Sequence, residues 1–141
     1  MKRVRDIEFM KNVRQIHEFD FGVFYYFDGL VISEVNEGVV FRWKMAKKAV
    51  KAAHDLYGKD EPIVYISNRI NNYLISPTDW FKFFKNRNQI SFYSVVGKTT
   101  GSYLSIVIER ILFRSSIPKF STLEEAIDWS MEEITSKKSF F

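Results

Sequence analysis

Alternating and clustered apolar positions divide the chain into short strands and helices. Residues 15–36 contain two apolar runs that are rich in β-branched and aromatic residues and are joined at Asp28-Gly29. Asp-Gly is a favoured hairpin turn because both positions tolerate a positive φ. The pattern therefore predicts an antiparallel hairpin near the start of the domain.

A helix is predicted after this hairpin, over residues 42–57. Apolar side chains recur there at helical spacing, and Gly58 stands where a C-terminal cap with a positive φ is expected. The next apolar run, "PIVYIS" (62–67), has four consecutive apolar residues. Such a run indicates burial on both faces, as in the middle of a parallel sheet.

The second half of the chain alternates helices with strands. The patterns predict helices over 77–87 and 101–113, a strand over 90–97, a short strand at 117–120 and a last helix beginning after residue 121. Ser76 can cap the first of these helices, and Asp79 lies at its third position, where a carboxylate meets the positive end of the helix dipole. Ser121 and Glu124 form a capping-box pattern for the last helix.

The element order is therefore ββαβαβαβα, which predicts one α/β domain. Strands that alternate with helices favour a mostly parallel sheet, here with about five strands, four helices and one antiparallel hairpin strand. We place the domain at 15–136, with a lead-in at 1–14 and a short tail at 137–141. A chain of 141 residues suits a single core of this kind.

Composition and charge narrow the function classes. Hydrophobic residues make up 46% of the chain, too many for a disordered protein, and there is no cysteine for disulfides, thiol catalysis or thiolate metal sites. The basic N-terminus lacks a signal peptide's apolar segment, and no apolar run is long enough to span a membrane. The net charge of +4 is spread along the chain rather than gathered in a basic stripe. We therefore expect a cytoplasmic protein with no membrane span and no nucleic-acid partner.

The motifs for enzyme chemistry are incomplete. The segment "GKTT" (97–100) lies between a strand and a helix, but Phe92 stands where a phosphate-binding loop needs a glycine. His17 and His54 lack metal-ligand spacing, and no Gly-x-Ser-x-Gly elbow is present. We therefore expect a protein that is not an enzyme and has no cofactor and no metal.

The richest candidate site is the loop that follows the central strand. It contains Ser67, Asn68, Arg69, Asn71 and Asn72. Open α/β sheets usually keep their sites at the carboxyl ends of strands, where these side chains could form a polar rim for an anion or a partner's backbone. The alternative is structural: asparagines bond their own backbone in loops, and the arginine could pair with Asp79, Glu34 or Glu37 to fix the loop.

The helix after this loop carries four large aromatic residues within five positions, namely Trp80, Phe81, Phe83 and Phe84. One helix face can enter the core, and four aromatics exceed what a narrow face hides. Surplus apolar surface beside a polar loop indicates a partner or an apolar ligand, whereas a wide buried face is the structural alternative.

The element order resembles that of small bacterial STAS-like domains, the fold of the anti-sigma-factor antagonists. The likeness includes "SEVNEGVVFRW", "PIVYISNRINNY" and "STLEEAIDW" and covers about residues 15–135. It is closest to the diverged branch that is grouped by fold with the CRAL-TRIO lipid carriers. In the antagonists a serine at the start of the second core helix is phosphorylated. Ser76 occupies roughly that place, but Ile75 and Pro77 replace the family's motif, so no phosphorylation role is carried over.

The resemblance implies protein binding or small-ligand sensing rather than catalysis. We expect a non-catalytic regulatory module that engages a protein partner or small ligand through loop 67–76 and the following helix. The candidate binding residues are Ser67, Asn68, Arg69, Asn71, Asn72, Ser76 and Trp80. The alternatives are a carrier or sensor of an apolar or lipid-like ligand, using the aromatic residues of 80–84, and a structural homodimer joined through that surface.

Overall fold

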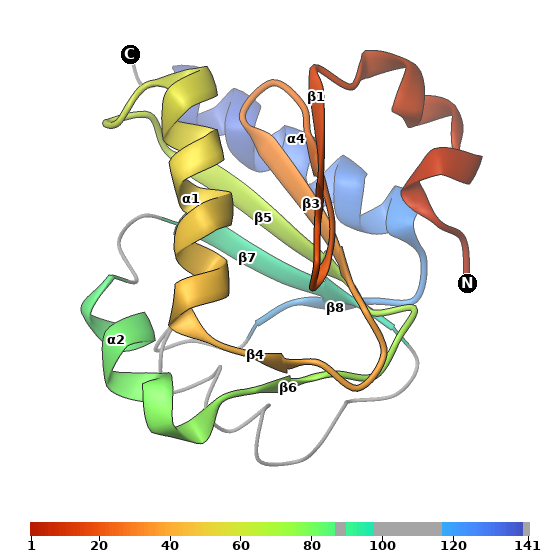
Figure 1. The fold of residues 1–141 in the computed structure, drawn as a ribbon. Coiled ribbons are helices and arrows are strands. Elements are labelled where there is room, and N and C mark those ends of the chain that lie inside the picture. The colour runs from red at the N-terminus through yellow and green to blue at the C-terminus, as the bar shows by residue number, and fades with distance from the viewer. Residues whose placement is uncertain (87–89, 98–116, 140–141) are drawn as a thin grey trace.

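The computed structural model describes residues 1–86, 90–97 and 117–139. In these ranges six strands form one sheet in the order β1-β2-β3-β5-β7-β8 (Figure 1). The strands are β1 (Gln15–Phe19), β2 (Gly22–Tyr26), β3 (Leu30–Val35), β5 (Ile63–Asn68), β7 (Ile90–Val96) and β8 (Lys119–Phe120). The pairs β1–β2 and β2–β3 are antiparallel, and the rest of the sheet is parallel.

A second, smaller sheet lies beside the carboxyl ends of the strands. It pairs β4 (Val40–Phe41) with β6 (Leu74–Ile75) in parallel. The described helices are α1 (Trp43–Tyr57), α2 (Trp80–Lys85) and α4 (Leu123–Ser139), together with the 3-10 turns η1 (Val4–Asp6), η2 (Glu8–Asn12) and η3 (Pro77–Asp79). Helix α1 lies in front of the sheet in Figure 1, and α4 lies behind it.

Each face of the sheet has its own apolar core. On the α1 face, Phe24, Val31 and Phe41 pack with Ala49 and Ala53 of the helix. On the opposite face, α4 and the N-terminal turns cover a core that includes Val4, Ile32, Val64, Ile66, Leu123 and Ile127. Strand β5 contributes to both cores, so the predicted burial of its two faces is confirmed.

Several predicted elements are confirmed. Helix α1 begins and ends within one residue of the predicted bounds, and Gly58 after it has a φ of 99°. The hairpin turn at Asp28-Gly29 joins β2 to β3, with a φ of 71° at Gly29. The mixed α/β class is therefore as the sequence indicated.

The predicted count of five strands is wrong. The apolar stretch before Asp28 holds two strands, because the chain also turns at Asp20-Phe21 between β1 and β2. Gly22 permits this pairing, since a Cβ there would lie 2.6 Å from the backbone oxygen of Glu34. The short pair β4–β6 was also not predicted.

The helix predictions are partly corrected. Three α-helices lie in the described residues, and the predicted helix 101–113 lies outside them. The segment predicted as one helix from 77 to 87 divides into η3 and the short α2. The last helix is capped by Thr122, one residue later than the predicted Ser121: the Thr122 hydroxyl accepts from the Glu125 N–H at 3.2 Å and donates to the Glu125 carboxylate at 3.1 Å.

The N-terminal lead-in is part of the packed structure. Val4 is completely buried against the α4 face of the sheet. Its backbone N–H donates to the carboxylate of Glu34 at 2.8 Å, and the same carboxylate oxygen accepts from the Asn68 amide at 2.8 Å. At the other end, α4 continues to Ser139, past the predicted boundary at residue 136. None of the helices in the described ranges is long and apolar enough to cross a membrane.

Candidate functional site

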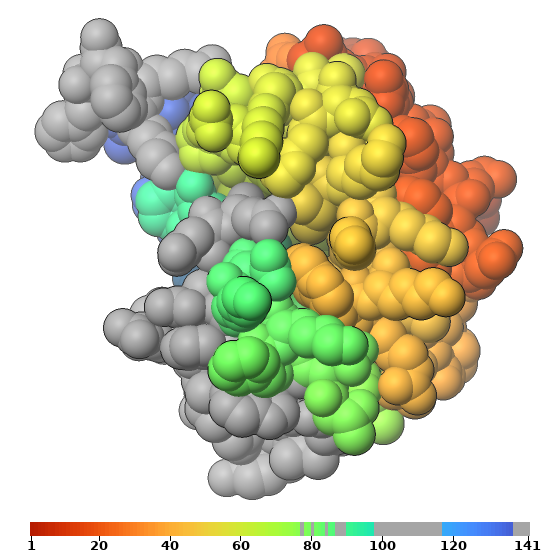
Figure 2. Space-filling view, turned by 60° about the vertical axis from the view of Figure 1, so that its left-hand side comes forward, coloured from red at the N-terminus to blue at the C-terminus, as the bar shows by residue number. Residues whose placement is uncertain are grey.

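An apolar pocket lies between α1 and the sheet. Its volume is about 100 Å³, and sixteen described residues line it. Fourteen of them belong to the strands β2, β3, β5 and β7, to the small β4–β6 sheet, and to α1 and α2; Tyr73 directly precedes β6 and Asn86 directly follows α2. None of these sixteen side chains is charged. Figure 2 shows α1 and α2 next to each other on this side of the molecule, with a narrow hollow between them.

Helix α1 forms one wall because its apolar positions share a face. Trp43, Ala46, Val50 and Ala53 all line the pocket, as the helical spacing in the sequence indicates. The alanines leave room that larger side chains would fill. The space between the helix and the sheet is therefore a consequence of small residues on α1 facing large aromatic residues on the strands.

The helix is held at this distance by two tyrosines outside the pocket, the buried Tyr26 and the half-buried Tyr57. The Tyr26 hydroxyl donates to the backbone oxygen of Ala49 at 2.9 Å. The Tyr57 hydroxyl donates to the backbone oxygens of Phe27 and Leu30. Burial raises the pKa of Tyr26, with a smaller contribution from the nearby Tyr57 phenol, and burial also raises the pKa of Tyr57. Both side chains therefore stay protonated donors well into the alkaline range.

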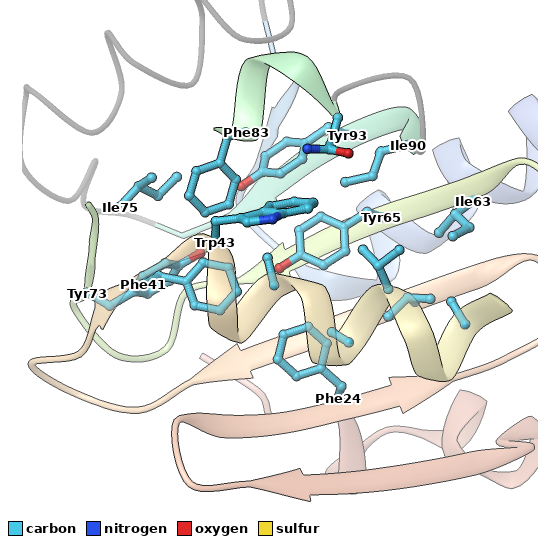
Figure 3. A pocket seen from close by; sticks show the side chains of 16 residues that line it. Phe24, Phe41, Trp43, Ile63, Tyr65, Tyr73, Ile75, Phe83, Ile90 and Tyr93 are labelled. Atoms are coloured by element: carbon cyan, nitrogen blue, oxygen red, sulfur yellow. The ribbon is translucent and has the colours of Figure 1, made fainter. Parts of the chain in front are cut away.

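Aromatic side chains form most of the remaining wall. Phe41 and Phe83 pack with ring centres 6.2 Å apart, and Trp43 meets Phe83 edge-on at 5.6 Å. Figure 3 shows the rings of Trp43 and Tyr65 among the side chains that line the pocket. A planar apolar group would meet ring faces and edges on most sides.

One end of the pocket is polar. The hydroxyls of Tyr65, Tyr73 and Tyr93 lie in the half of the pocket farther from Ile63 (Figure 3). Tyr65 hydrogen-bonds to the hydroxyl of Ser33. The hydroxyls of Tyr73 and Ser67 are 2.7 Å apart.

The Arg69 guanidinium joins this hydroxyl cluster. Arg69 is 8% exposed, and its Nε donates to the Ser67 hydroxyl at 3.2 Å. Its Nη2 donates to the Tyr93 hydroxyl at 3.3 Å, and the guanidinium lies over the Tyr73 ring at 5.0 Å from the ring centre. A buried cation is thus attached to two of the tyrosines that line the pocket.

The residues predicted as one polar rim divide among three places. Ser67 and Arg69 lie in the hydroxyl cluster next to the pocket. Asn68 is on the opposite face of β5, where its amide donates to Glu34 and to the backbone oxygen of Lys2. The remaining two asparagines, Asn71 and Asn72, lie in the loop itself.

These two asparagines connect neighbouring loops. The Asn71 amide donates to the backbone oxygen of Val35 at 3.1 Å. The Asn72 backbone N–H donates to the carboxylate of Glu37 at 2.7 Å, and its carbonyl accepts from Gly38 at 2.8 Å. These bonds hold the loop after β5 against the loop after β3.

The other predicted site residues lie at the start of η3 and α2. Ser76 is buried, and its hydroxyl is 3.0 Å from that of Thr78 and 3.5 Å from the Arg42 guanidinium. Trp80 begins α2, and its side chain lies outside the described part of the structure. Phe83 lines the pocket, whereas Phe81 is 60% exposed, so the four aromatics do not share one buried face.

The three carboxylates that the structural alternative offered as partners for Arg69 have hydrogen-bond donors of their own. Asp79 accepts from the Trp43 backbone, Glu37 from the Asn72 backbone, and Glu34 from Val4 and Asn68. Within the described ranges no group of three or more His, Asp or Glu side chains could hold a metal ion. Lys98 of the "GKTT" segment lies outside those ranges.

The spacing of three residues along β5 is a sequence signal for the hydroxyl cluster. Tyr65, Ser67 and Arg69 alternate along β5 and its end, so side chains at these positions share one face. The pocket itself had no such signal, because it is assembled from eight elements. Comparison of the chain with protein-family models, with curated proteins and with solved structures found no match.

Proposed function

We propose that the protein is a non-catalytic module that binds a small apolar ligand between α1 and the sheet. The observation that supports this proposal is the pocket itself: about 100 Å³ of space lined by sixteen uncharged, mostly aromatic and aliphatic residues. Small-ligand sites are typically concave and apolar, with a few polar groups that fix orientation. The hydroxyl cluster at one end would supply those groups.

The volume limits the ligand's size. An engineered apolar cavity of roughly 150 Å³ binds benzene. A cavity of about 100 Å³ that includes a hollow toward the surface suits one aromatic ring or a short hydrocarbon chain rather than a long acyl chain. The carrier or sensor alternative from the sequence is therefore favoured in a restricted form, for a small ligand.

The same pocket connects to the segment that the sequence singled out. Three residues that line the pocket belong to this segment. Tyr73 and Ile75 lie in loop 67–76, and Phe83 lies in the following helix. A bound ligand would therefore contact the loop and helix that we expected to engage a partner. We propose that a bound ligand holds this loop and helix in one conformation. The domain would be of the STAS-like type.

Binding of a neutral probe tests the proposal. With 1-hexanol as the probe, we expect a saturable rise in the melting temperature of the wild type. A ligand at a hundredfold excess over its Kd adds about 2.7 kcal/mol to the free energy of unfolding. Native mass spectrometry of freshly purified protein would show whether a ligand of this size is already bound.

A pocket-filling variant provides the matched comparison. Ala46 lines the pocket, so Ala46→Phe should fill it and abolish the response to hexanol. Lys48 is exposed on the same helix, so Lys48→Phe should leave the response intact. An equal response in wild type and Ala46→Phe would place binding elsewhere and refute the proposal.

A second candidate function is self-association through the exposed apolar residues near α2. Phe81 is 60% exposed, and the register partners Val40 and Leu74 of the small sheet are also exposed. Light scattering over a range of concentrations tests this candidate. It predicts a dimer for the wild type and a monomer for Phe81→Ser, whereas a monomeric wild type excludes it.

A further inference from the structure

Seven of the sixteen described residues that line the pocket are aromatic, and their rings form one connected set. The centre of each ring lies between 5.1 and 6.5 Å from the centre of at least one other ring of the set. Aromatic rings attract one another over this range of distances. We call this set the aromatic lining; its members are Phe24, Phe41, Trp43, Tyr65, Tyr73, Phe83 and Tyr93.

The rings of the aromatic lining are inclined to one another at different angles (Figure 3). The planes of Phe24 and Phe41 are 19° apart, whereas Trp43 meets Phe83 at 83°. An aromatic ring is negative on its face and positive at its edge. Because the rings are turned differently, the lining has both kinds of surface around one small space.

We infer that the natural ligand is a small neutral molecule built on a single aromatic ring. This inference rests on the proposed function, since it names the class of ligand for the same pocket. An aromatic ligand has a negative face and a positive edge of its own, so it can meet the edges and the faces of the lining. A saturated hydrocarbon has only C–H groups on its surface and lacks the negative face.

The size and the charge of the pocket agree with this class of ligand. A volume of about 100 Å³ suits one ring, and a rigid ring loses less conformational freedom on binding than a flexible chain. None of the sixteen described lining residues is charged. A carboxylate or an ammonium group would therefore leave water without meeting an opposite charge among them, which is costly.

The first measurement compares benzyl alcohol with cyclohexylmethanol on the wild-type protein by isothermal titration calorimetry. The two probes have the same carbon skeleton and the same hydroxyl, and differ only in whether the ring is aromatic. The saturated alcohol is the more hydrophobic, so a pocket that recognises apolar surface alone would bind it at least as tightly. We expect benzyl alcohol to bind at least about threefold more tightly, because contacts between rings add to the burial of apolar area.

The outcomes separate this inference from the proposed function. Equal affinities, or tighter binding of cyclohexylmethanol, would overturn the inference and leave the proposed function standing. The same holds if neither ring compound binds while 1-hexanol does. If none of the three alcohols binds, both proposals are overturned.

Charged analogues of the same ring test the neutrality of the ligand. We expect benzoate and benzylammonium to bind at least about tenfold more weakly than benzyl alcohol, because each must give up its hydration. Benzylammonium is the more demanding comparison, since cations are attracted to aromatic faces. Binding of either ion as tightly as the alcohol would overturn the assignment of a neutral ligand.

A leucine substitution assigns the preference to the aromatic lining. Phe83→Leu removes one ring of the lining and keeps an apolar side chain, so the affinity ratio of benzyl alcohol to cyclohexylmethanol should fall by about twofold or more. Phe92→Leu makes the same change on the opposite face of the sheet, where Phe92 packs with Trp129, and should keep the wild-type ratio. A folded Phe83→Leu protein with the wild-type ratio would overturn the inference.

Trp43→Leu supplies an independent variant in case Phe83→Leu does not fold. Trp43 is the first residue of α1, and its ring lines the pocket and meets Phe83 edge-on. We expect the same fall in the affinity ratio. If Trp43→Leu leaves the ratio at its wild-type value, the preference does not come from the aromatic lining and the inference fails.

Discussion

The carboxylate of Asp79 accepts a hydrogen bond from the backbone N–H of Trp43 across 2.8 Å. Trp43 is the first residue of α1, where backbone N–H groups have no partner within the helix. The sequence indicated that Asp79 would serve its own helix, but in the structure it caps the preceding one. This bond connects the start of α1 to the η3–α2 segment, and so it joins two walls of the pocket.

We predict that Asp79→Ala lowers the free energy of unfolding by about 0.5–2 kcal/mol, the usual cost of losing a helix cap. Asp79→Asn should cost less, since its amide oxygen can still accept from Trp43. Urea unfolding measures both. Asp55→Ala is the comparison, because Asp55 forms an exposed ion pair with Lys51, and such pairs are worth at most about 1 kcal/mol. A loss no larger in Asp79→Ala than in Asp55→Ala would show that the cap does not matter.

Glu34 fastens the N-terminal segment to the sheet, and its removal should be costly. In Glu34→Ala the Val4 N–H and the Asn68 amide lose their common acceptor. Buried donors left unsatisfied cost about 1–3 kcal/mol each. Glu34→Gln retains an oxygen and should recover most of this loss. Amide hydrogen exchange at Val4 gives a local readout, with faster exchange expected in Glu34→Ala.

A comparison with an exposed carboxylate keeps this prediction specific. Glu18 lies on the edge strand β1 and is exposed, so Glu18→Ala should leave the free energy of unfolding within about 0.5 kcal/mol of the wild type. The interpretation of Glu34 as an anchor is wrong if Glu34→Ala and Glu18→Ala have equal effects and Val4 exchange is unchanged.

Stability should decrease at alkaline pH because of the two tyrosines that hold α1. Their pKa values are raised above the usual 10.0 by burial, so the folded state keeps both phenolic protons at a pH where the unfolded chain releases them. Their contribution is complete below pH 10.0 and is lost as the pH rises above it. Urea unfolding as a function of pH measures this loss. Tyr57→Phe should be less stable at neutral pH but show a shallower alkaline decline, and an unchanged decline would contradict the assignment.

Phe81 and Phe83 should respond differently to the same substitution. Phe83 lines the pocket and packs on Trp43, so Phe83→Ser should weaken hexanol binding and lower stability. Phe81 is exposed and does not line the pocket, so Phe81→Ser should change the free energy of unfolding by no more than about 0.5 kcal/mol and leave hexanol binding intact. Titration and thermal unfolding of both variants test this difference, which would be absent if α2 were not oriented as described.

The sequence predicted the elements whose signals are local. The apolar run of β5 indicated a strand buried on both faces, and the spacing from Trp43 to Tyr57 indicated α1. The first turn was missed because the apolar residues around Phe21 conceal the break between β1 and β2. Predicting six strands required knowing that Gly22 lies against the backbone of Glu34, which is a tertiary contact.

The candidate site was predicted in part. Loop 67–76 does contribute to the pocket, through Tyr73 and Ile75, but neither was among the predicted binding residues. The prediction favoured polar side chains by type, and two of them, Asn71 and Asn72, instead join the loop to residues 35–38. The period-two alternation that brings Tyr65, Ser67 and Arg69 to one face was available in the sequence, whereas the space created by the alanines of α1 opposite the strands was not.

The central claim is that a small ligand binds between α1 and the sheet, and intermolecular nuclear Overhauser effects test it most directly. The measurement uses isotope-labelled protein with 1-hexanol at saturation. We predict contacts from the hexanol chain to side chains that line the pocket, among them Ile63, Val50 and Tyr93. Contacts confined to the exposed Phe81 region, or none to any residue lining the pocket, would contradict the account.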